Sequence, residues 1–254
     1  MIHFKTPLEI EKMEKGGKIL SDVLFAVIDN IKPGVSEREL DDLAERLILE
    51  KGGEPGFKRV NGYKNTICVS TNDVVVHGIP GDYRIKQGDV VGIDCGVFYE
   101  GLNTDMSETI LVGEDSKIEK FLVTGKRALE EAIKVAKEGN RIGDISKTIQ
   151  DIVEKEAGYS VVRSLIGHGV GKKLHEEPEV PGFLNEPIAE TPILKEGMTI
   201  AIEVIYNMGG RDVELMKDGW TIRTKDKSLS GVFERTVAIT SSEPLILTPE
   251  SAKI

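Results

Sequence analysis

Lys86-Gln87-Gly88-Asp89-Val90-Val91-Gly92-Ile93-Asp94 has a counterpart in the second half of the chain, Lys195-Glu196-Gly197-Met198-Thr199-Ile200-Ala201-Ile202-Glu203. Each copy opens with a lysine and a glycine, a pattern that favours a turn. Each copy then runs through apolar and β-branched residues, which favour a strand. Each ends on a carboxylate. This repeat indicates that one folding unit occurs twice in the chain.

Further matches in the same order support an internal duplication. Asp105-Met106-Ser107 corresponds to Glu234-Arg235-Thr236, so two acids of the first half match two acids of the second. Positions in the helical segments also match at a constant offset: Gly34, Leu40, Leu47, Ile48 and Gly53 with Gly139, Ile145, Ile152, Val153 and Gly158. We predict a single domain, residues 1–254, made of two related α+β halves of about 1–114 and 115–254. The two halves would face each other across a pseudo-twofold axis, with the four acids near that axis.

Helix signals precede strand signals in both halves. Thr6-Pro7-Leu8-Glu9 is typical of a helix start, because Thr6 can cap the helix and Glu9 completes a capping box. Pro33-Gly34 predicts the end of that helix. Further helices are expected over 36–52, 117–137 and up to Ala157-Gly158, and strands over 66–70, 74–77, 89–97, 109–112, 161–166, 198–205 and 231–240.

Composition narrows the class of protein. The 254 residues are 39% hydrophobic and 30% charged, which is typical of a globular protein. The net charge of −10 argues against binding to nucleic acid or to an anionic membrane, since both need basic surfaces. The two cysteines, Cys68 and Cys95, lie in strand-like runs and are expected to be reduced thiols. No signal-peptide or membrane-spanning run is present, so we expect a cytoplasmic protein.

Four carboxylates lie in or beside the strand-like runs: Asp94, Asp105, Glu203 and Glu234. A carboxylate in a buried strand is costly unless it is paired or bound to a metal. The alternative is that backbone donors or an arginine satisfy each acid. Few basic residues occur near these acids, which weakens that alternative. Bound cations would neutralise such a cluster without any lysine or arginine.

Three of the four histidines lie in segments rich in glycine or proline. His168 and His175 flank Gly169-Val170-Gly171-Lys172-Lys173-Leu174, and His77 lies in Val76-His77-Gly78-Ile79-Pro80. A lone histidine is more often structural, but three in such settings favour a site, because imidazole is both a metal ligand and a proton carrier. His168 with the four acids makes a ligand set of oxygen and nitrogen without thiolate. This set suits two divalent ions such as Mn, Fe, Co or Zn, bridged by shared carboxylates.

Taken together, these motifs make the sequence similar to the type I methionine aminopeptidases over essentially its whole length. The resemblance rests on Asn72 to Pro80, Asp94 to Ser107, Gly167 to Gly171, His175-Glu176-Glu177-Pro178, Ile202-Glu203-Val204, Asp218-Gly219-Trp220 and Phe233-Glu234-Arg235-Thr236. It implies the α+β pita-bread fold, with a central curved antiparallel sheet covered by helices on its outer face. It also implies removal of the N-terminal initiator methionine from nascent proteins whose second residue is small, with a metal-activated water attacking the first peptide bond.

The resemblance also implies how the five expected ligands share two metal ions. Asp94 would bind one ion. His168 and Glu203 would bind the other. Asp105 and Glu234 would bridge the two.

The same resemblance implies catalytic roles for three residues. His175 would donate a hydrogen bond to the scissile carbonyl or to the oxyanion that forms from it. His77 would lie near the scissile nitrogen and assist its departure. Glu203, besides binding metal, would act as general base and then as general acid.

The expected pocket for the methionine side chain consists of Tyr63, Cys68 and Trp220, again by resemblance. Its surroundings depart from the family pattern. Leu174 stands where relatives usually have Phe, and Val60 stands where Tyr is common. Further departures occur at Lys64, Leu165 and Gly182-Phe183. The departures concern the shape of the pocket and leave the expected metal ligands intact.

Two rival interpretations come from other classes of protein. Proline-specific peptidases of the same fold usually carry an additional N-terminal domain, and here the catalytic repeat begins by about Thr6. A binding module without catalysis would be expected to lose metal ligands, whereas all five are present. The resemblance therefore implies a monomeric enzyme that acts on nascent polypeptide N-termini beginning with methionine, with at most transient ribosome contact.

Overall fold

A computed structural model describes residues 2–250 of the chain. The helices in order are α1 (Pro7–Asp29), α2 (Glu37–Glu50), α3 (Ser116–Val135) and α4 (Ile142–Gln150), which continues as a π-helical turn, Asp151–Glu156. The short 3₁₀ helices are Phe57–Arg59 and Ile188–Glu190. The strands are β1 (Glu54–Pro55), β2 (Ile67–Thr71), β3 (Val74–Val76), β4 (Val90–Tyr99), β5 (Leu102–Leu111), β6 (Ser160–Val161), β7 (Gly167–Gly169), β8 (Glu176–Val180), β9 (Thr199–Asn207), β10 (Val213–Leu215), β11 (Ile222–Thr224), β12 (Ser230–Ala238) and β13 (Leu245–Ile246).

Each of the first two helices begins directly after a capping residue. Thr6 and Glu9 form the predicted capping box at the start of α1, and Pro7 occupies the first turn. Ser36 and Glu39 form a second capping box at the start of α2. Such a cap contributes about 1 kcal/mol to helix stability. None of the helices within residues 2–250 combines the length and the apolar composition needed to cross a bilayer.

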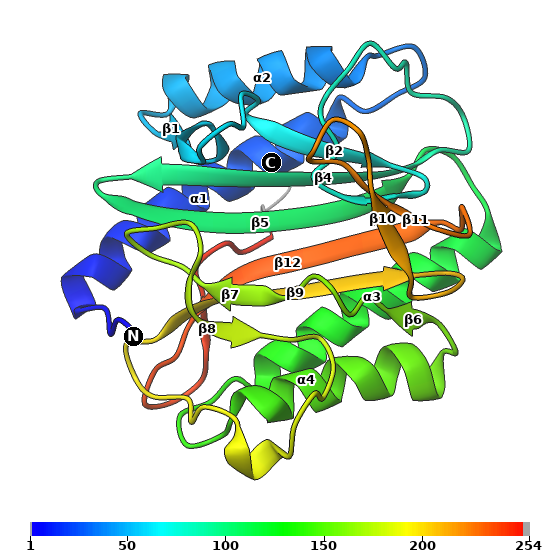
Figure 1. Cartoon of the computed structure of the whole chain (residues 1–254). Coiled ribbons are helices and arrows are strands. Elements are labelled where there is room, and N and C mark those ends of the chain that lie inside the picture. The colour runs from blue at the N-terminus through cyan, green and yellow to red at the C-terminus, as the bar shows by residue number, and fades with distance from the viewer. Residues whose placement is uncertain (1, 251–254) are drawn as a thin grey trace.

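One antiparallel sheet runs through the molecule in the order β1-β4-β5-β12-β9-β7-β8 (Figure 1). The strand pairs β4–β5 and β9–β12 come from different halves of the chain and meet where β5 lies beside β12. A separate small sheet has the order β10-β11-β3. The long central strands therefore bring distant parts of the sequence together at the middle of the main sheet.

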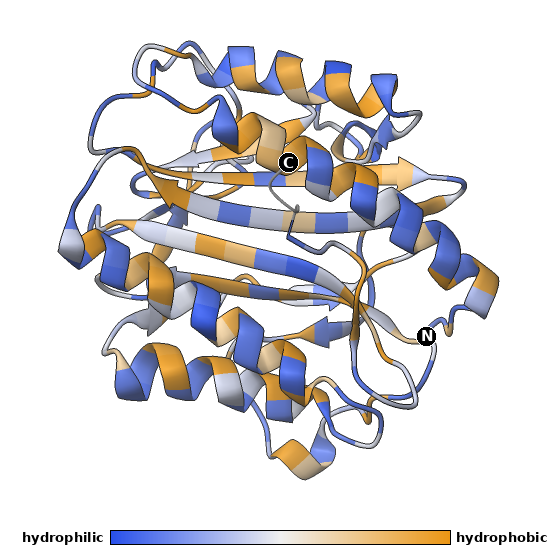
Figure 2. Cartoon of the chain, turned by 180° about the vertical axis from the view of Figure 1, so that it is seen from behind, coloured by the Kyte–Doolittle hydropathy of each residue, from blue (hydrophilic) through white to orange (hydrophobic). Residues whose placement is uncertain are grey.

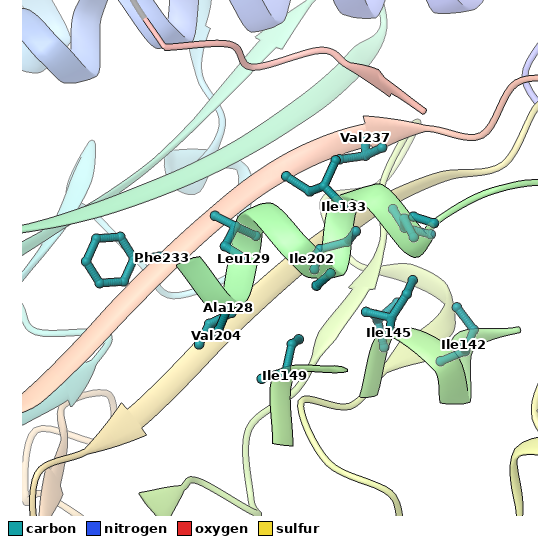
Figure 3. Close-up of a cluster of buried hydrophobic side chains, with 14 of the residues drawn as sticks. Ala128, Leu129, Ile133, Ile142, Ile145, Ile149, Ile202, Val204, Phe233 and Val237 are labelled. Atoms are coloured by element: carbon teal, nitrogen blue, oxygen red, sulfur yellow. The ribbon is translucent and has the colours of Figure 1, made fainter. Parts of the chain in front are cut away.

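Helices cover one face of this sheet. Figure 2, which views the molecule from behind, shows them in front of the strands. The core between α3, α4, β9 and β12 is drawn in Figure 3, where Leu129 and Ile133 of α3 lie beside Ile202 of β9 and Val237 of β12. A second core packs α1 and α2 against β4. Because side chains alternate across a strand, the residues next to these core positions point to the opposite, uncovered face.

Most of the predicted elements agree with the structure, but two strand predictions need correction. The strand expected over 109–112 begins much earlier, since β5 starts at Leu102 directly after a turn. The single strand expected over 161–166 is wrong: the chain there forms only the two-residue β6 and then an irregular segment before β7. The strand predicted from Val74 is present as β3 and pairs with β11 in the small sheet. Val161 and Val162 are buried, and Leu165 and Ile166 are half-buried, although most of this segment is a loop. Local patterning does not distinguish such a buried loop from a strand.

Candidate active site

Three acids lie in one row that crosses four central strands on the open face of the sheet. Asp94 of β4 is the register partner of Ser107 in β5, and Ser107 is the partner of Glu234 in β12. Glu234 in turn is the partner of Glu203 in β9. Direct cross-strand partners project to the same side of a sheet. Asp94, Glu234 and Glu203 therefore share one face, although they lie in three different strands.

A second row beside the first adds the remaining expected ligands. Asp105 precedes Ser107 by two positions and so points to the same face. His168 of β7 is the partner of Ala201, two positions before Glu203. The His168 Nε2 and Asp105 Oδ2 atoms are 3.9 Å apart. One ligand atom each of Asp105, His168 and Glu234 lies within 4.8 Å of the other two.

Within residues 2–250, no lysine or arginine pairs with these acids on the open face. Arg235 follows Glu234 in the strand and points to the other side, where its guanidinium pairs with Glu108 at 2.6 Å. Asp94 Oδ1 and Glu234 Oε1 are buried and accept no hydrogen bond from the described residues. A buried carboxylate oxygen without a donor is strongly unfavourable unless a cation compensates it.

Burial governs the protonation of these acids in the metal-free protein. It raises the pKa of Asp94 to about 7 and that of Glu203 to about 8, where the charge of Asp94 adds to the shift. Burial, with the neighbouring acids as second cause, raises the pKa of Asp105 and Glu234 well above the usual range. Ionising all four acids at once is therefore unfavourable in this buried cluster. Bound divalent cations would compensate the four negative charges.

A backbone contact fixes the tautomer of the His168 ring. Its Nδ1 lies 2.9 Å from the Gly169 carbonyl oxygen, which can only accept a hydrogen bond. The proton therefore sits on Nδ1, and Nε2 presents its lone pair toward Asp105, as in the orienting contacts of metal-bound histidines. Burial lowers the pKa of His168 to about 4, with His175 contributing, so the ring is neutral near pH 7. The donor set of carboxylate oxygens and one imidazole fits a divalent metal centre.

A cavity of about 320 Å³ opens over the acids. Asp94, Asp105, His168 and Glu203 line it, whereas Glu234 is 1% exposed and lies beneath, within ligand distance of Asp105 and His168. The acids that line the cavity come from β4, β5 and β9, and the acid beneath it, Glu234, comes from β12. The site therefore depends on all four strands.

The two other predicted histidines line the same cavity. The rings of His168 and His175 meet edge to face with centroids 4.4 Å apart. Burial lowers the pKa of His77 and of His175, so both are neutral at pH 7. His77 has a φ of 56°, a strained conformation for a residue other than glycine, and such strain is concentrated at functional sites.

The outer part of the cavity is apolar. Tyr63 and Trp220 pack at an angle with ring centroids 5.1 Å apart, and the Tyr63 hydroxyl donates to the Ile67 carbonyl at 2.8 Å. Cys68 lies beside them, and burial raises the pKa of its thiol, which keeps it neutral. Asp218 shapes the turn that presents Trp220 by accepting the Trp220 N–H at 2.9 Å.

Three further residues of this pocket were not predicted as part of it: Phe57, Val60 and Leu174. Phe57 can lie against the pocket because Gly96 has no side chain; a Cβ there would stand 2.8 Å from the ring. Leu174 and Val60 were noted only as departures from the family pattern. Phe57 gave no local signal, since its role depends on the contact with Gly96, which is distant in sequence.

The arrangement as a whole can be compared with known proteins. A family model described as metallopeptidase family M24 matches residues 11–241. A methionine aminopeptidase of Clostridium perfringens is 43% identical over 98% of this chain and 99% of its own length. The methionine aminopeptidase of Escherichia coli strain K12 is 40% identical over 97% of this chain and 94% of its own. The chain therefore belongs to metallopeptidase family M24 and, within that family, to the methionine aminopeptidases.

Solved structures agree with this placement. The crystal structure of a methionine aminopeptidase from Thermotoga maritima matches with a TM-score of 0.94 and 40% identity, over 98% of this chain and 99% of that one. A prolidase from Pyrococcus furiosus matches less closely, with a TM-score of 0.79 and 29% identity over 66% of its length. The predicted pita-bread fold and the predicted class, a metal-dependent aminopeptidase, are confirmed.

Proposed function

We propose that this enzyme releases the N-terminal methionine of new polypeptides whose second residue is small. This proposal rests mainly on how polar and apolar residues are arranged in one cavity. Its inner end holds Asp94, Asp105, His168 and Glu203 with Glu234 beneath, and its outer end is the apolar cluster around Tyr63 and Trp220. A free α-amine and an apolar side chain on the same residue fit the acidic and apolar ends of such a cavity.

We infer that the acids and His168 hold two divalent ions, with Mn, Fe, Co and Zn as the candidates. Asp94 would bind one ion, His168 and Glu203 the other, and Asp105 and Glu234 would contact both. The donorless oxygens of Asp94 and Glu234 support this assignment. When bound, such ions activate a water molecule and polarise a carbonyl group.

The residues of the chain would supply the remaining catalysis. Glu203 accepts the proton of the attacking water and delivers it to the departing amine as general base and then acid. His175, neutral at pH 7, donates a hydrogen bond to the carbonyl oxygen, where negative charge develops. His77 faces the same cavity and assists the scissile nitrogen. Both histidines need one ring N–H to donate, which a neutral imidazole supplies.

The apolar end would select the side chain. The methionine thioether is unbranched and polarisable, and it packs well against aromatic rings. Tyr63, Cys68 and Trp220 would contact it, with Phe57 and Leu174 completing the wall. A neutral Cys68 thiol adds an apolar contact in place of a nucleophile.

We further propose that the enzyme works in the cytoplasm as a monomer, as a single catalytic domain of two related halves, with at most transient contact to the ribosome. The acidic net charge of −10 supports the absence of nucleic acid recognition.

The first test is release of free methionine from a Met-Ala-Ser peptide, with an X-Pro dipeptide in parallel. Each substrate is assayed before chelation, after chelation, and after adding back Mn, Fe, Co or Zn. We expect chelator-sensitive, metal-restored release from the methionine peptide alone. Cleavage of only the proline substrate would replace the proposal by a prolidase activity. Absence of both cleavages with metal bound would contradict an enzymatic role.

A further inference from the structure

The loop that carries His175 connects β7 to β8 over residues 170–175. Within residues 2–250 the His175 ring makes no hydrogen bond to another side chain or to the backbone. Packing and the path of this loop therefore determine where the ring lies. What holds the loop also holds the hydrogen-bond donor that the proposed reaction needs.

A buried ion pair from outside the hairpin anchors this loop. Lys5 Nζ lies 2.8 Å from Glu176 Oε2, and the two side chains are 2% and 12% exposed. The other oxygen of Glu176, Oε1, accepts the backbone N–H of Lys173 at 2.9 Å. Glu176 directly follows His175. One carboxylate thus joins the N-terminal segment to the loop on both sides of the histidine.

Lys5 is itself held in place along its whole length. Its backbone N–H donates to the Gly197 carbonyl at 2.7 Å, and its Nζ also donates to the His3 carbonyl at 3.3 Å. Gly171 of the loop packs directly on the lysine stem, since a Cβ at Gly171 would stand 2.4 Å from Lys5 Cε. The loop backbone and the buried lysine therefore fit each other closely, and neither can shift alone.

A buried lysine is rare because desolvation of the ammonium is costly. Most ion pairs of the described chain are exposed, as for Lys12 and Glu100, whose side chains are 33% and 50% exposed. Exposed pairs of that kind contribute little. The burial of Lys5 indicates a role that a surface pair does not have.

We propose that Lys5 is a positioning residue which, through Glu176, holds His175 in the place where it donates to the substrate carbonyl. This inference rests on the proposed function of the site. Loss of the anchor lets the loop shift, and a displacement of about 1 Å at a catalytic donor costs up to about 100-fold in rate. Binding of the methionine side chain in the apolar pocket does not need this donor, so we expect a smaller effect on KM than on kcat.

The test is a double-mutant cycle on methionine release by the metal-loaded, full-length enzyme. Lys5→Met keeps the apolar stem and removes the charge; Lys12→Met is the matched control at an exposed pair. We expect Lys5→Met to lower kcat by about 10- to 100-fold with KM changed less than about twofold. In the His175→Ala background the same change should lower kcat by less than about twofold, because coupled residues are not additive. An equal loss in both backgrounds, or an equal loss in Lys12→Met, would overturn the proposal.

A second variant, and a measurement that does not depend on catalysis, test the anchor separately from the activity. Glu176→Gln preserves the shape of the carboxylate and leaves Lys5 packed, and it should show the same dependence on His175. Hydrogen exchange of the amides in 170–176 should accelerate in Lys5→Met and Glu176→Gln but not in Lys12→Met. If the wild type releases no methionine, the proposed function fails while the exchange result still reports on the anchor. Unchanged exchange in both variants would refute the anchoring itself.

Discussion

Glu203 and Glu234 are direct cross-strand partners in β9 and β12, so two carboxylates that are 31 positions apart in the chain face the same side of the sheet. Like charges on directly opposite positions of two strands are destabilising unless a cation compensates them. The structure places a third acid, Asp105, and His168 beside them. The predictions below follow from the tension between these buried charges and the cations that would relieve it.

We predict that Glu203→Gln abolishes turnover and leaves the fold intact. The amide keeps the shape of the side chain but cannot accept the proton of the attacking water, a role that contributes about 10²- to 10⁴-fold. Methionine release should be measured together with bound metal and circular dichroism. Glu196→Gln, at an exposed position, is the control. Retained activity of Glu203→Gln with metal verified would rule out the general-base role.

His175→Ala should lower kcat far more than it raises KM. Removing one donor to a developing oxyanion costs about 10²- to 10³-fold, whereas the ground-state carbonyl carries less charge and loses less. Steady-state kinetics on a methionine peptide separate the two parameters. His3→Ala, which changes a histidine outside the three motifs, provides the comparison. An effect confined to KM would contradict the assignment.

The stability of the metal-free enzyme should fall as the pH rises. Burial raises the pKa of Asp94 to about 7 and that of Glu203 to about 8 in the folded state, whereas an unfolded carboxyl has a pKa of about 4. Below that pKa both states are protonated and these groups cost nothing. At higher pH the unfolded chain loses the protons first, which favours unfolding until the folded pKa has been passed.

Thermal unfolding after chelation tests this dependence. The Tm of Glu203→Gln minus that of the wild type should be near zero at pH 4, grow with pH, and level off above about pH 8. Added divalent metal should remove most of the trend in the wild type. A Tm difference that is independent of pH between 4 and 8 would show that Glu203 does not carry the raised pKa.

Breaking the ion pair behind the cluster of acids should destabilise the protein strongly. Arg235 and Glu108 are 5% and 6% exposed, and Arg235 Nη1 also donates to the Ser107 and Glu234 carbonyls. Arg235→Met leaves Glu108 buried without a partner, which costs about 3–5 kcal/mol. Urea unfolding measures the loss. Lys126→Met, at an exposed pair, should change the free energy of unfolding by less than about 1 kcal/mol.

The size of residue 174 should set the tolerance for the first substrate residue. Leu174 lies in the pocket wall with Phe57 and is 8% exposed. We expect Leu174→Phe to fill part of the cavity, so that peptides beginning with branched or aromatic residues lose about 10-fold in kcat/KM relative to methionine peptides. Competition between such peptides measures the ratio. An unchanged ratio would show that Leu174 does not limit the pocket; Leu49→Phe, at an exposed position, controls for the substitution itself.

Residue patterns predicted much of this molecule. The capping boxes at Thr6 and Ser36 marked helix starts, since capping depends on neighbours three positions away. The strands that contain Asp94 and Glu203 were visible because hydrophobic patterning and β-branching are local properties. The candidate residues were identified by their chemistry, as acids and histidines where apolar strands or glycine-rich turns made them unusual. The internal repeat predicted that the four acids lie near one axis, and ligand chemistry added His168 to them. The placement of His77, His175 and the pocket residues beside them was an expectation from family resemblance.

Tertiary structure alone decided how those residues meet. Register between β5 and β12 places Glu234 beside Ser107, and a shift of β12 by one residue would have turned Glu234 toward the helices. The short β6, the contact of Phe57 with Gly96 and the burial of Lys5 against Glu176 leave no local trace. Each depends on packing between segments far apart in the chain. The sequence by itself thus determined which groups are available and which elements carry them, whereas sheet register and packing determined their distances, their burial and hence their pKa values.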